Sequence, residues 1–552
     1  MNQIIGKFLK LIRPEKKQLY QIYAYSIFRG LISLSFPLGI QSIISLLQAG
    51  RVSAAWLLLV FVIVAGISFS GILQLLQLRI TETIRQRIFA RAAFDFAFRI
   101  PRFEFEDISK HNAPELMNRF FEVPILQKSI SKVLIEVPAA VLQIFFALLV
   151  LSFYQSFFIS FSLIFLFLVV LVFVLTAKKG IQTSIEESKH KYKAASWLEE
   201  LARVKDTFKL AGKTDFHLKK MDALSVNYVK ARESHYRVLH TQYLILLLFK
   251  IFISAALLLI GGYLVLEQKM NIGQFVAAEI IVLLIIDSSE KLILNFDTLY
   301  DVFTSLEKIE EVSGMPLQKE TDDLQSPMPA SGEPIQVEFN AISFKYPGNQ
   351  NNILHEASTV IKKGERVCIA GENSSGKSTL LQLMLGLYKP DSGTILINGI
   401  HAENYHPDKL NPYLGNGLSK HNLFEGTLAE NISLGREHIT TETMLWAIRN
   451  SGLEAYLKNS PEGLNTRLEL SGSRLSESIY TKIVLARAVV NRPKLLALEF
   501  CIECIEKDER EKIIDFLTDQ SNNWTLIIIG NDDYLMHKVD RVIKIEKGKI
   551  SG

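Results

Sequence analysis

The sequence predicts a multidomain protein in which an all-α transmembrane domain of six helices is followed by an α/β domain. The chain has 552 residues, which is more than one domain usually needs, and 49% of them are hydrophobic. The apolar excess lies in the first 300 residues, and the remainder alternates short strands and helices. We expect the transmembrane domain at 1–312, a linker rich in proline, serine and acidic residues at 313–334, and the α/β domain at 335–552.

Six apolar segments are each close to the roughly 20 residues that a helix needs to cross a bilayer. They lie at 19–47, 54–78, 133–154, 157–177, 243–266 and 272–300. Buried helices of a soluble core would need an amphipathic pattern, and Phe157–Ala177 has no charged face to turn to water. The segments therefore predict six transmembrane helices.

The loops between these segments predict their orientation. Three connections are short, and two, at 79–132 and 178–242, are long, helical in pattern and rich in charge. Lysine and arginine gather at the N-terminus and at the ends of the long loops, whereas the short loops carry only Arg51 and Lys269. By the positive-inside rule, both termini and both long loops are cytoplasmic. Met1–Leu11 is expected to lie on the membrane surface and not to be a signal peptide.

Charge and cysteine content exclude some other functions. The net charge of +4 is explained by this topology and gives no indication of nucleic acid binding. The three cysteines lie in the predicted cytosolic half, so reduced thiols are expected. Cys501 and Cys504 have C-x-x-C spacing, but the absence of a second pair argues against a metal site.

The most informative motif is a phosphate-binding loop, Gly-Glu-Asn-Ser-Ser-Gly-Lys-Ser-Thr, that begins at Gly371. In the pattern G-x4-G-K-[ST], backbone N–H groups curl around phosphates, the lysine reaches the β- and γ-phosphates, and the hydroxyl coordinates magnesium. A buried strand, Arg366–Ala370, enters the loop, and an apolar helix, Thr379–Leu385, leaves it with its dipole directed at the anion. This context predicts a P-loop nucleotide-binding domain that binds ATP and Mg²⁺. The expected binding residues are Gly371, Asn373, Ser374, Ser375, Gly376, Lys377, Ser378 and Thr379.

With six spans, two long cytoplasmic loops and a P-loop domain, the sequence resembles a half-transporter of the ABC exporter family over nearly its whole length. Phe344–Gly348 is similar to the adenine-stacking turn of that family, which implies that Tyr346 lies under the base. Leu423–Asn431 and Leu485–Ala488 also fit the family. Pro114–Arg119 is similar to the segment through which such exporters contact their nucleotide domains.

The resemblance also identifies catalytic positions at which this chain differs. Ser419 stands at the position of the Q-loop glutamine, and Asn531 at that of the switch histidine. Walker B ends in Glu499-Phe500, where Glu499 keeps a carboxylate for the metal and Phe500 replaces the glutamate that polarises water. An aromatic ring cannot accept a proton, and loss of a general base typically costs about 10²–10⁴ in rate.

The signature helix, LSGGQ in the family, is altered as well, and reads Leu475, Ser476, Glu477, Ser478 and Ile479. The family's small residues let backbone N–H groups donate to the γ-phosphate of the opposing subunit. Glu477 brings a negative charge toward that phosphate. Two unit charges about 4–6 Å apart repel by a few kcal/mol at an effective dielectric constant near 20, or about two powers of ten in closure. Together these replacements predict retained ATP binding and lost hydrolysis.

The resemblance implies a dimer, since each ATP lies between the P-loop of one chain and the signature of the other. One hypothesis is a degenerate half of a heterodimeric exporter in the cell membrane, whose partner, a second ABC half-transporter, performs any hydrolysis. Another is a non-pumping homodimer that acts as a receptor, scaffold or gated pore with envelope export components. A third is an ordinary active exporter.

Ionisable residues within the spans are the candidates for the substrate pathway. Arg29, Glu136 and Asp287 can be explained by pairing between helices or by positions near span ends, which leaves Glu279 as the better pathway residue. The segment Gly273–Ile280 is similar to exporters of the peptide and protein-secretion branch. This similarity favours polypeptide cargo.

Overall fold

The computed structural model describes residues 6, 13–48, 54–109, 116–154, 156–318, 332–418, 423–468, 475–499 and 502–551. The chain forms two compact units. The first comprises residues 1–103 and 111–316, and the second comprises residues 104–110 and 317–552. Most of the predicted linker, residues 319–331, lies outside the described ranges.

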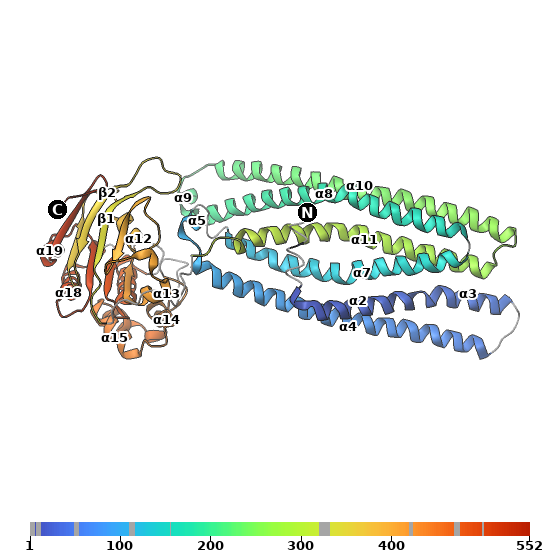
Figure 1. Ribbon diagram of the computed structural model, residues 1–552, viewed down its shortest axis with the longest axis horizontal. Helices are drawn as coiled ribbons and strands as arrows, with labels where there is room; N and C mark the ends of the chain where they lie inside the picture. Colours follow the sequence, from blue (N-terminus) through green and yellow to red (C-terminus); the bar gives the residue numbers. More distant parts are fainter. Residues whose placement is uncertain are drawn as a thin grey trace. The chain divides into compact units, whose positions relative to one another are not determined.

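Long helices build the first unit and run side by side along it (Figure 1). They are α2 (Lys16–Ser33), α3 (Ser35–Gln48), α4 (Ala54–Arg99), α7 (Glu122–Tyr154), α8 (Ser156–Arg203), α10 (Phe216–Leu266) and α11 (Ile272–Ser313). The predicted span 19–47 is thus two helices that break at Leu34. Pro37 accounts for the break, because proline lacks the N–H that would bond the carbonyl of Ser33. Shorter helical turns complete the unit: η1 (Arg13–Glu15), η2 (Ile100–Arg102), η3 (Asn118–Phe121) and α9 (Lys205–Leu210).

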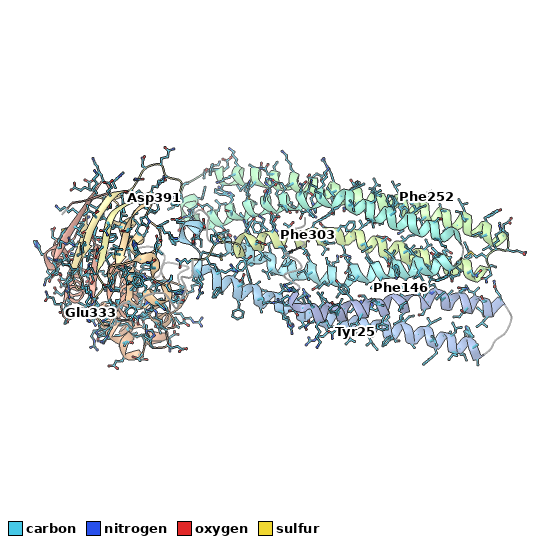
Figure 2. All side chains as sticks on the ribbon, in the orientation of Figure 1. Tyr25, Phe146, Phe252, Phe303, Glu333 and Asp391 are labelled. Atoms are coloured by element: carbon cyan, nitrogen blue, oxygen red, sulfur yellow. The ribbon has the colours of Figure 1, made fainter. Side chains whose placement is uncertain are left out.

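The surface of this unit suits a membrane. Within the described ranges, five helical stretches are long and apolar enough to cross one: Arg13–Gln48, Ala54–Arg102, Asn118–Tyr154, Phe216–Leu266 and Ile272–Ser313. The remaining predicted span, 157–177, lies within α8. Phe61 and Phe252 leave 70% and 71% of their surface exposed, and Figure 2 shows the ring of Phe252 on α10. Soluble monomers rarely expose apolar side chains in such numbers.

Helix α11 forms the centre of this unit. Its first turn is closed by a capping box, in which Asn271 Oδ1 accepts from the Gln274 N–H at 2.7 Å and Gln274 Oε1 accepts from the Asn271 N–H at 3.0 Å. Ala278 and Ile281 are fully buried against the neighbouring helices. Because lipid tails are as apolar as these side chains, close van der Waals packing between helices, and not removal from water, stabilises this part of the bundle.

A short helix from the loop after α4 belongs to the second unit. This helix, α5 (Phe105–Ser109), packs the ring of Phe105 edge-on against Tyr388, with 5.1 Å between centroids. The predicted contact segment, Pro114–Arg119, follows this helix in the chain and stays a prediction. Pro114 lies outside the described residues, and Arg119 forms an ion pair with Glu311 within the first unit.

Two main sheets build the second unit (Figure 1). An antiparallel sheet has the order β2 (Leu354–Ile361), β1 (Val337–Phe344), β4 (Ser392–Ile397), β5 (Ile400–His401). A second sheet has the order β12 (Lys549–Ser551), β11 (Arg541–Glu546), β3 (Arg366–Ala370), β10 (Thr525–Ile529), β9 (Leu495–Leu498), β6 (Leu414–Gly417). Its strands are parallel except for β12. The carboxyl ends of β3, β9 and β10 therefore meet at one edge, where ligands bind in open α/β sheets.

Helices cover both faces of the second sheet. They are α12 (Lys377–Met384), α13 (Pro407–Leu410), α14 (Leu428–Ser433), α15 (Thr441–Asn450), α16 (Glu454–Asn459), α17 (Glu477–Val489), α18 (Lys507–Thr518) and α19 (Asp533–Lys538). One apolar core lies between this sheet and α15, α17 and α18, and a second lies between the two sheets and α12. Short turns η4 (Ala402–Asn404), η5 (Asn411–Tyr413), η6 (Gly463–Asn465) and η7 (Ile502–Cys504), with the pair β7 (Gly426–Thr427) and β8 (Arg467–Leu468), complete the unit.

Candidate nucleotide site

The phosphate-binding loop joins β3 to α12, as its sequence predicts. Gly371 and Gly376 have φ angles of +144° and +108°, a region that glycine enters without penalty. A Cβ atom on Gly371 would lie 2.3 Å from the carbonyl oxygen of Ile545, so only glycine fits there. The loop ends at the N-terminus of α12, where free backbone N–H groups and the helix dipole favour an anion.

The side chain of Lys377 folds back onto the phosphate-binding loop. Its Nζ donates to the carbonyl oxygens of Gly371 at 2.8 Å and Glu372 at 2.5 Å. Partial burial lowers the pKa of Lys377, and the Glu499 carboxylate acts in the opposite direction. Phosphate oxygens can replace the two carbonyl acceptors, which gives the ammonium group a stronger, charge-assisted partner.

The two residues predicted to hold the metal are in contact. Ser378 lies on the first turn of α12, and Glu499 directly follows β9. Ser378 Oγ donates to Glu499 Oε1 at 2.5 Å. One hydroxyl and one carboxylate suit Mg²⁺, which keeps several waters and takes its other ligands from the nucleotide phosphates. Among the described residues, no group of three or more His, Cys, Asp or Glu could hold a metal by itself. The pair therefore fits a metal that is carried in by the nucleotide.

Tyr346 lies beside α12 on the turn that follows β1. Its hydroxyl is 3.0 Å from Thr379 Oγ1 and donates to Gln382 Oε1 at 2.9 Å. The ring is packed edge-on against Phe344 and Tyr388, with centroid distances of 5.1 and 5.2 Å. These contacts hold the predicted adenine-stacking ring close to the phosphate-binding helix.

Gln382 and Tyr388 also contact this ring and its hydroxyl group, and neither residue was predicted from the sequence. Gln382 carried a usable signal, because it follows Thr379 by three residues and so lies on the same face of α12. Tyr388 carried none, since only the tertiary fold brings it between Phe105 and Tyr346.

Replacing Tyr346 with alanine is expected to weaken ATP binding about tenfold or more, because stacking of a base on an aromatic ring contributes about 1–3 kcal/mol. Tyr346→Phe keeps the ring and loses only the two hydroxyl contacts, so it should retain most of the affinity. Calorimetric titration of the purified variants with MgATP measures both. Equal affinities for Tyr346→Ala and the wild type would show that the ring does not contact the base.

Asn531, at the predicted switch position, lies next to the start of the P-loop. It follows β10, and its side-chain amide both accepts a hydrogen bond from the backbone of Gly371 and donates one to it. The Gly371 N–H donates to Asn531 Oδ1 at 3.3 Å, and Asn531 Nδ2 donates to the Gly371 carbonyl at 3.5 Å. An amide in this place can donate a hydrogen bond but cannot titrate as an imidazole does.

The predicted signature residues lie at the start of α17, apart from the P-loop. Ser476 is the N-cap of this helix, and its Oγ accepts a hydrogen bond from the Ile479 N–H at 3.3 Å. Glu477 is the first helical residue and is exposed. A carboxylate here complements the helix dipole and competes with any phosphate for the same N–H groups. Leu475 and Ser478 are half-buried beside it.

Two predicted site residues, Ser419 and Phe500, lie outside the described residues. The remaining P-loop positions, Asn373, Ser374 and Ser375, occupy the loop itself, where Ser374 also has a positive φ of 64°. The site thus gathers the P-loop, Glu499 and Asn531 from three neighbouring strands of one sheet.

The charged residues within the spans are mostly paired. Arg29 donates to Gln77 Oε1 at 2.7 Å, and Glu136 accepts from Asn295 Nδ2 at 2.8 Å, both between helices. Asp287 pairs with Lys291 within α11 at 2.7 Å. Glu279 is half-buried on α11 and stays a predicted pathway residue.

Comparisons with known proteins identify the class. Residues 22–288 match the model of the ABC transporter transmembrane region, and residues 354–499 match the model of the ABC transporter domain. The chain therefore belongs to the ABC transporter family and has the domain arrangement of its exporters. It is a multi-pass membrane protein with an ATP-binding domain.

Several curated relatives are similar over about half of this chain. The leukotoxin translocation ATP-binding protein LktB of Mannheimia glucosida is 28% identical over 53% of this chain and 40% of its own length. The alpha-hemolysin translocation ATP-binding protein HlyB of Escherichia coli O157:H7 is 28% identical over 53% of this chain and 41% of its length. A Bacillus subtilis (strain 168) protein described as a multidrug export ATP-binding/permease protein, YgaD, is 26% identical over 52% and 50%. The matched region thus spans half or less of each relative.

The fold is also that of a solved exporter. A bacterial Atm1-family ABC exporter with ATP bound superposes with a TM-score of 0.86 at 17% sequence identity. The match covers 97% of this chain and 95% of that chain. At this identity, the likeness shows the fold alone.

Proposed function

We propose that this protein is an ATP-binding subunit of a dimeric ABC exporter whose own ATP hydrolysis is weak or absent. One observation carries the proposal: the binding half of the site is built, while the catalytic half is replaced. Lys377, Ser378 and Glu499 converge at one sheet edge. The groups that would activate water and sense the γ-phosphate are replaced by Phe500 and Asn531.

A heterodimer is the arrangement that best explains this combination. One composite site would pair Lys377 and Phe500 with the signature of the partner chain, and the other would pair the partner's Walker motifs with the Leu475–Ile479 signature of this chain. The partner's Walker motifs would then hydrolyse ATP, at the composite site that Glu477 weakens. Co-purification with a second ABC half-transporter from native membranes supports this arrangement, and robust hydrolysis by this chain alone rules it out.

Glu477 offers a direct test of the composite site. Glu477→Gly is expected to lower about 100-fold the ATP concentration that closes the paired nucleotide domains, since it removes a charge that repels the γ-phosphate. Distances between spin labels on the two nucleotide domains measure closure. Glu442→Gly, which removes an exposed first-turn glutamate from α15, is the matched control and should leave closure unchanged. Equal effects of the two substitutions would contradict the assignment.

A non-pumping homodimer is the second candidate, and the replacements at both halves of the composite site favour it. Two copies of this chain would have two identical sites, each without the base, the histidine and a consensus signature. Such a dimer would act as a nucleotide-responsive receptor, scaffold or gated pore together with envelope export components. For the homodimer, we expect purified chains that hold ATP, do not hydrolyse it and do not co-purify with an ABC partner.

For the cargo, we infer a polypeptide. The names of two relatives refer to translocation of leukotoxin and alpha-hemolysin, and Gly273–Ile280 resembles the same branch. A third relative, described as a multidrug exporter, makes a small molecule the competing class. Glu279→Gln is expected to reduce transport without changing ATP binding, as measured with the exported proteins of the native host.

A further inference from the structure

A buried histidine on α10 joins three helices of the first unit. His235 is only 2% exposed, and both of its ring nitrogens have partners. Thr183 Oγ1 on α8 is 2.9 Å from His235 Nδ1, and Asp297 Oδ1 on α11 is 3.2 Å from His235 Nε2. The ring also packs edge-on against Tyr300 of α11, with 5.8 Å between centroids. The nucleotide motifs include none of these residues, so ATP binding does not explain the cluster.

A neutral bridge two turns further along α10 joins the same three helices. Gln242 Nε2 donates to Thr176 Oγ1 of α8 at 2.6 Å and to the hydroxyl oxygen of Tyr300 on α11 at 2.9 Å. A Cβ atom on Gly180 of α8 would lie 2.2 Å from Cζ of Tyr300, so a larger residue there would displace the tyrosine ring. These contacts fix the spacing of the three helices around His235.

The hydroxyl of Thr183 can satisfy the imidazole in either protonation state. In a neutral ring that donates from Nε2 to Asp297, Nδ1 is an acceptor, and the hydroxyl can donate to it. In the imidazolium, both nitrogens are donors. The hydroxyl hydrogen can then turn to the carbonyl oxygen of Lys179 or Gly180, each at 3.0 Å, while Oγ1 accepts from Nδ1. His235 can therefore gain a proton without losing a hydrogen bond.

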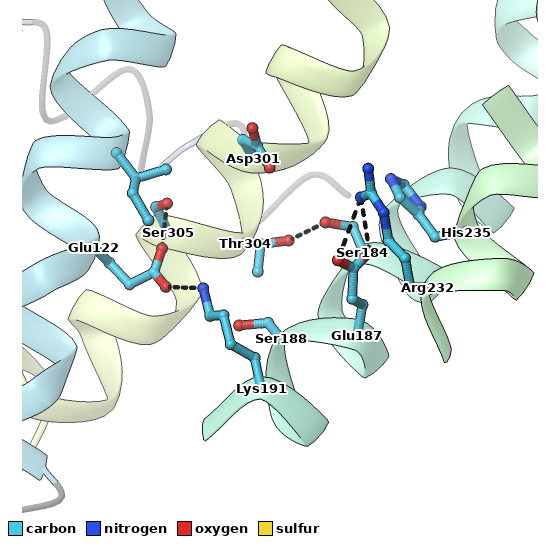
Figure 3. A pocket seen from close by; sticks show the side chains of 11 residues that line it. Glu122, Ser184, Glu187, Ser188, Lys191, Arg232, His235, Asp301, Thr304 and Ser305 are labelled. Carbon is cyan, nitrogen blue, oxygen red and sulfur yellow. Dashed lines mark hydrogen bonds and ion pairs between the residues drawn. The ribbon is translucent and has the colours of Figure 1, made fainter. Parts of the chain in front are cut away.

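A polar cavity of about 70 Å³ gives protons a path to the ring. It lies between α7, α8, α10 and α11, and His235 lines it (Figure 3). This volume has room for a few water molecules. Asp301 also lines the cavity and is exposed, so water can enter there. Because His235 precedes the predicted span at 243–266, we expect this end of the helices on the cytoplasmic side.

Two ion pairs near the ring are neutral overall. Arg232 lies one turn before His235 on α10 and pairs with Glu187 of α8 at 3.2 Å. Lys191 of α8 pairs with Glu122 of α7 at 2.8 Å, across the cavity from His235 (Figure 3). Neither pair therefore decides the protonation state of the histidine.

Two carboxylates of α11 make the surroundings of the ring negative. Asp297 is hydrogen-bonded to the ring itself, and Asp301 lines the same cavity. The lysines on the neighbouring segments, Lys132 of α7 and Lys179 of α8, are exposed, so water and salt screen their charges. Burial favours the neutral ring, but a carboxylate in direct contact favours the imidazolium. A charge-assisted hydrogen bond is about twice as strong as a neutral one, so we expect the carboxylate to prevail.

We propose that His235 is a proton-binding site that controls the packing of α8, α10 and α11. With a proton bound, the imidazolium donates to Thr183 and to the carboxylate of Asp297, and the opposite charges join α10 to α11. Without the proton, the neutral ring keeps its hydrogen bonds but loses the attraction between charges. Acidification on the cytoplasmic side therefore tightens this part of the bundle.

Nitrogen-15 NMR of the full chain in proteoliposomes, labelled at histidine, measures the protonation state directly. The chain has 11 histidines, so the signals of His235 are taken as the difference between the wild type and His235→Gln. In a titration from pH 5.5 to 8.5, His235 of the wild type should lose its proton about one pH unit higher than it does in Asp297→Asn, which is a tenfold difference in proton affinity. A ring that stays neutral down to pH 5.5, or that titrates alike in both proteins, would overturn the proposal.

Thermal unfolding measures the effect on packing. An imidazolium that the fold stabilises contributes fully below about pH 6.5 and less as the pH rises, so His235→Gln should lower the melting temperature more at pH 6 than at pH 8. Asp297→Asn keeps the ring and should show the same pH dependence. His190→Gln is the matched control, because it removes a histidine that pairs with a carboxylate, Glu186, at 3.4 Å outside the cavity. Its effect should not depend on pH. A loss for His235→Gln that is equal at both pH values, or larger at pH 8, would show that the ring is neutral in the fold and contradict the proposal.

Discussion

Lys377→Ala is expected to weaken MgATP binding by about 100-fold or more. The lysine ammonium would form charge-assisted hydrogen bonds to the β- and γ-phosphates, each of which contributes about 1.5–3 kcal/mol. Because about 1.4 kcal/mol corresponds to a tenfold change in Kd, the loss of two such bonds gives at least two powers of ten. Calorimetric titration of the purified protein with MgATP measures this change.

The control for this experiment is Lys363→Ala in the same unit. Lys363 is exposed and pairs with Glu333 at 2.6 Å, and a surface pair of this kind contributes at most about 1 kcal/mol. Nucleotide affinity should therefore stay at the wild-type value. If Lys377→Ala bound MgATP as tightly as Lys363→Ala did, the P-loop would not be the nucleotide site.

The purified wild type is expected to release phosphate at a rate about 10²–10⁴ below that of a variant with the consensus residues restored. That variant is Ser419→Gln, Glu477→Gly, Phe500→Glu and Asn531→His combined. Phe500→Glu alone should recover only part of the rate, because residues that act on one transition state are not additive. A phosphate-release assay with saturating MgATP compares the variants.

Phe500→Gln is the matched control, because glutamine has the shape of glutamate but cannot take a proton from water. It should not raise the rate. The proposal of a non-hydrolysing subunit fails if the wild type alone turns over ATP rapidly and Lys377→Ala abolishes that turnover. A wild type that is slow alone but fast with a second ABC chain supports the heterodimer.

The P-loop could be predicted because everything that forms it is local in the chain. The expected strand Arg366–Ala370 coincides with β3, and the loop conformation follows from the two glycines that it contains. The helix begins at Lys377, two residues before the predicted start, because its first turn includes the lysine and serine of the motif itself. Sequence patterns locate such elements well and their ends less well.

The first span shows how a local rule can be missed. Its hydropathy is continuous from 19 to 47, which predicts one helix, yet the helix breaks at Leu34. Pro37 carried the signal for this break, since a proline inside a helix removes a backbone hydrogen bond. The contact of α5 with Tyr388 had no such signal, because Phe105 and Tyr388 are 283 positions apart in the chain.

By itself, the sequence determined the membrane-spanning half and the nucleotide motif, and it is the source of the proposal that the catalytic groups are replaced. Hydropathy and motif spacing depend on residues that are neighbours along the chain, so both can be assessed without knowledge of the fold. Only the tertiary structure decided that Ser378 meets Glu499, and that Tyr388 packs against Tyr346. Such pairings depend on the packing of distant helices and strands, and a rotation of one helix by a single residue would turn each side chain to another face.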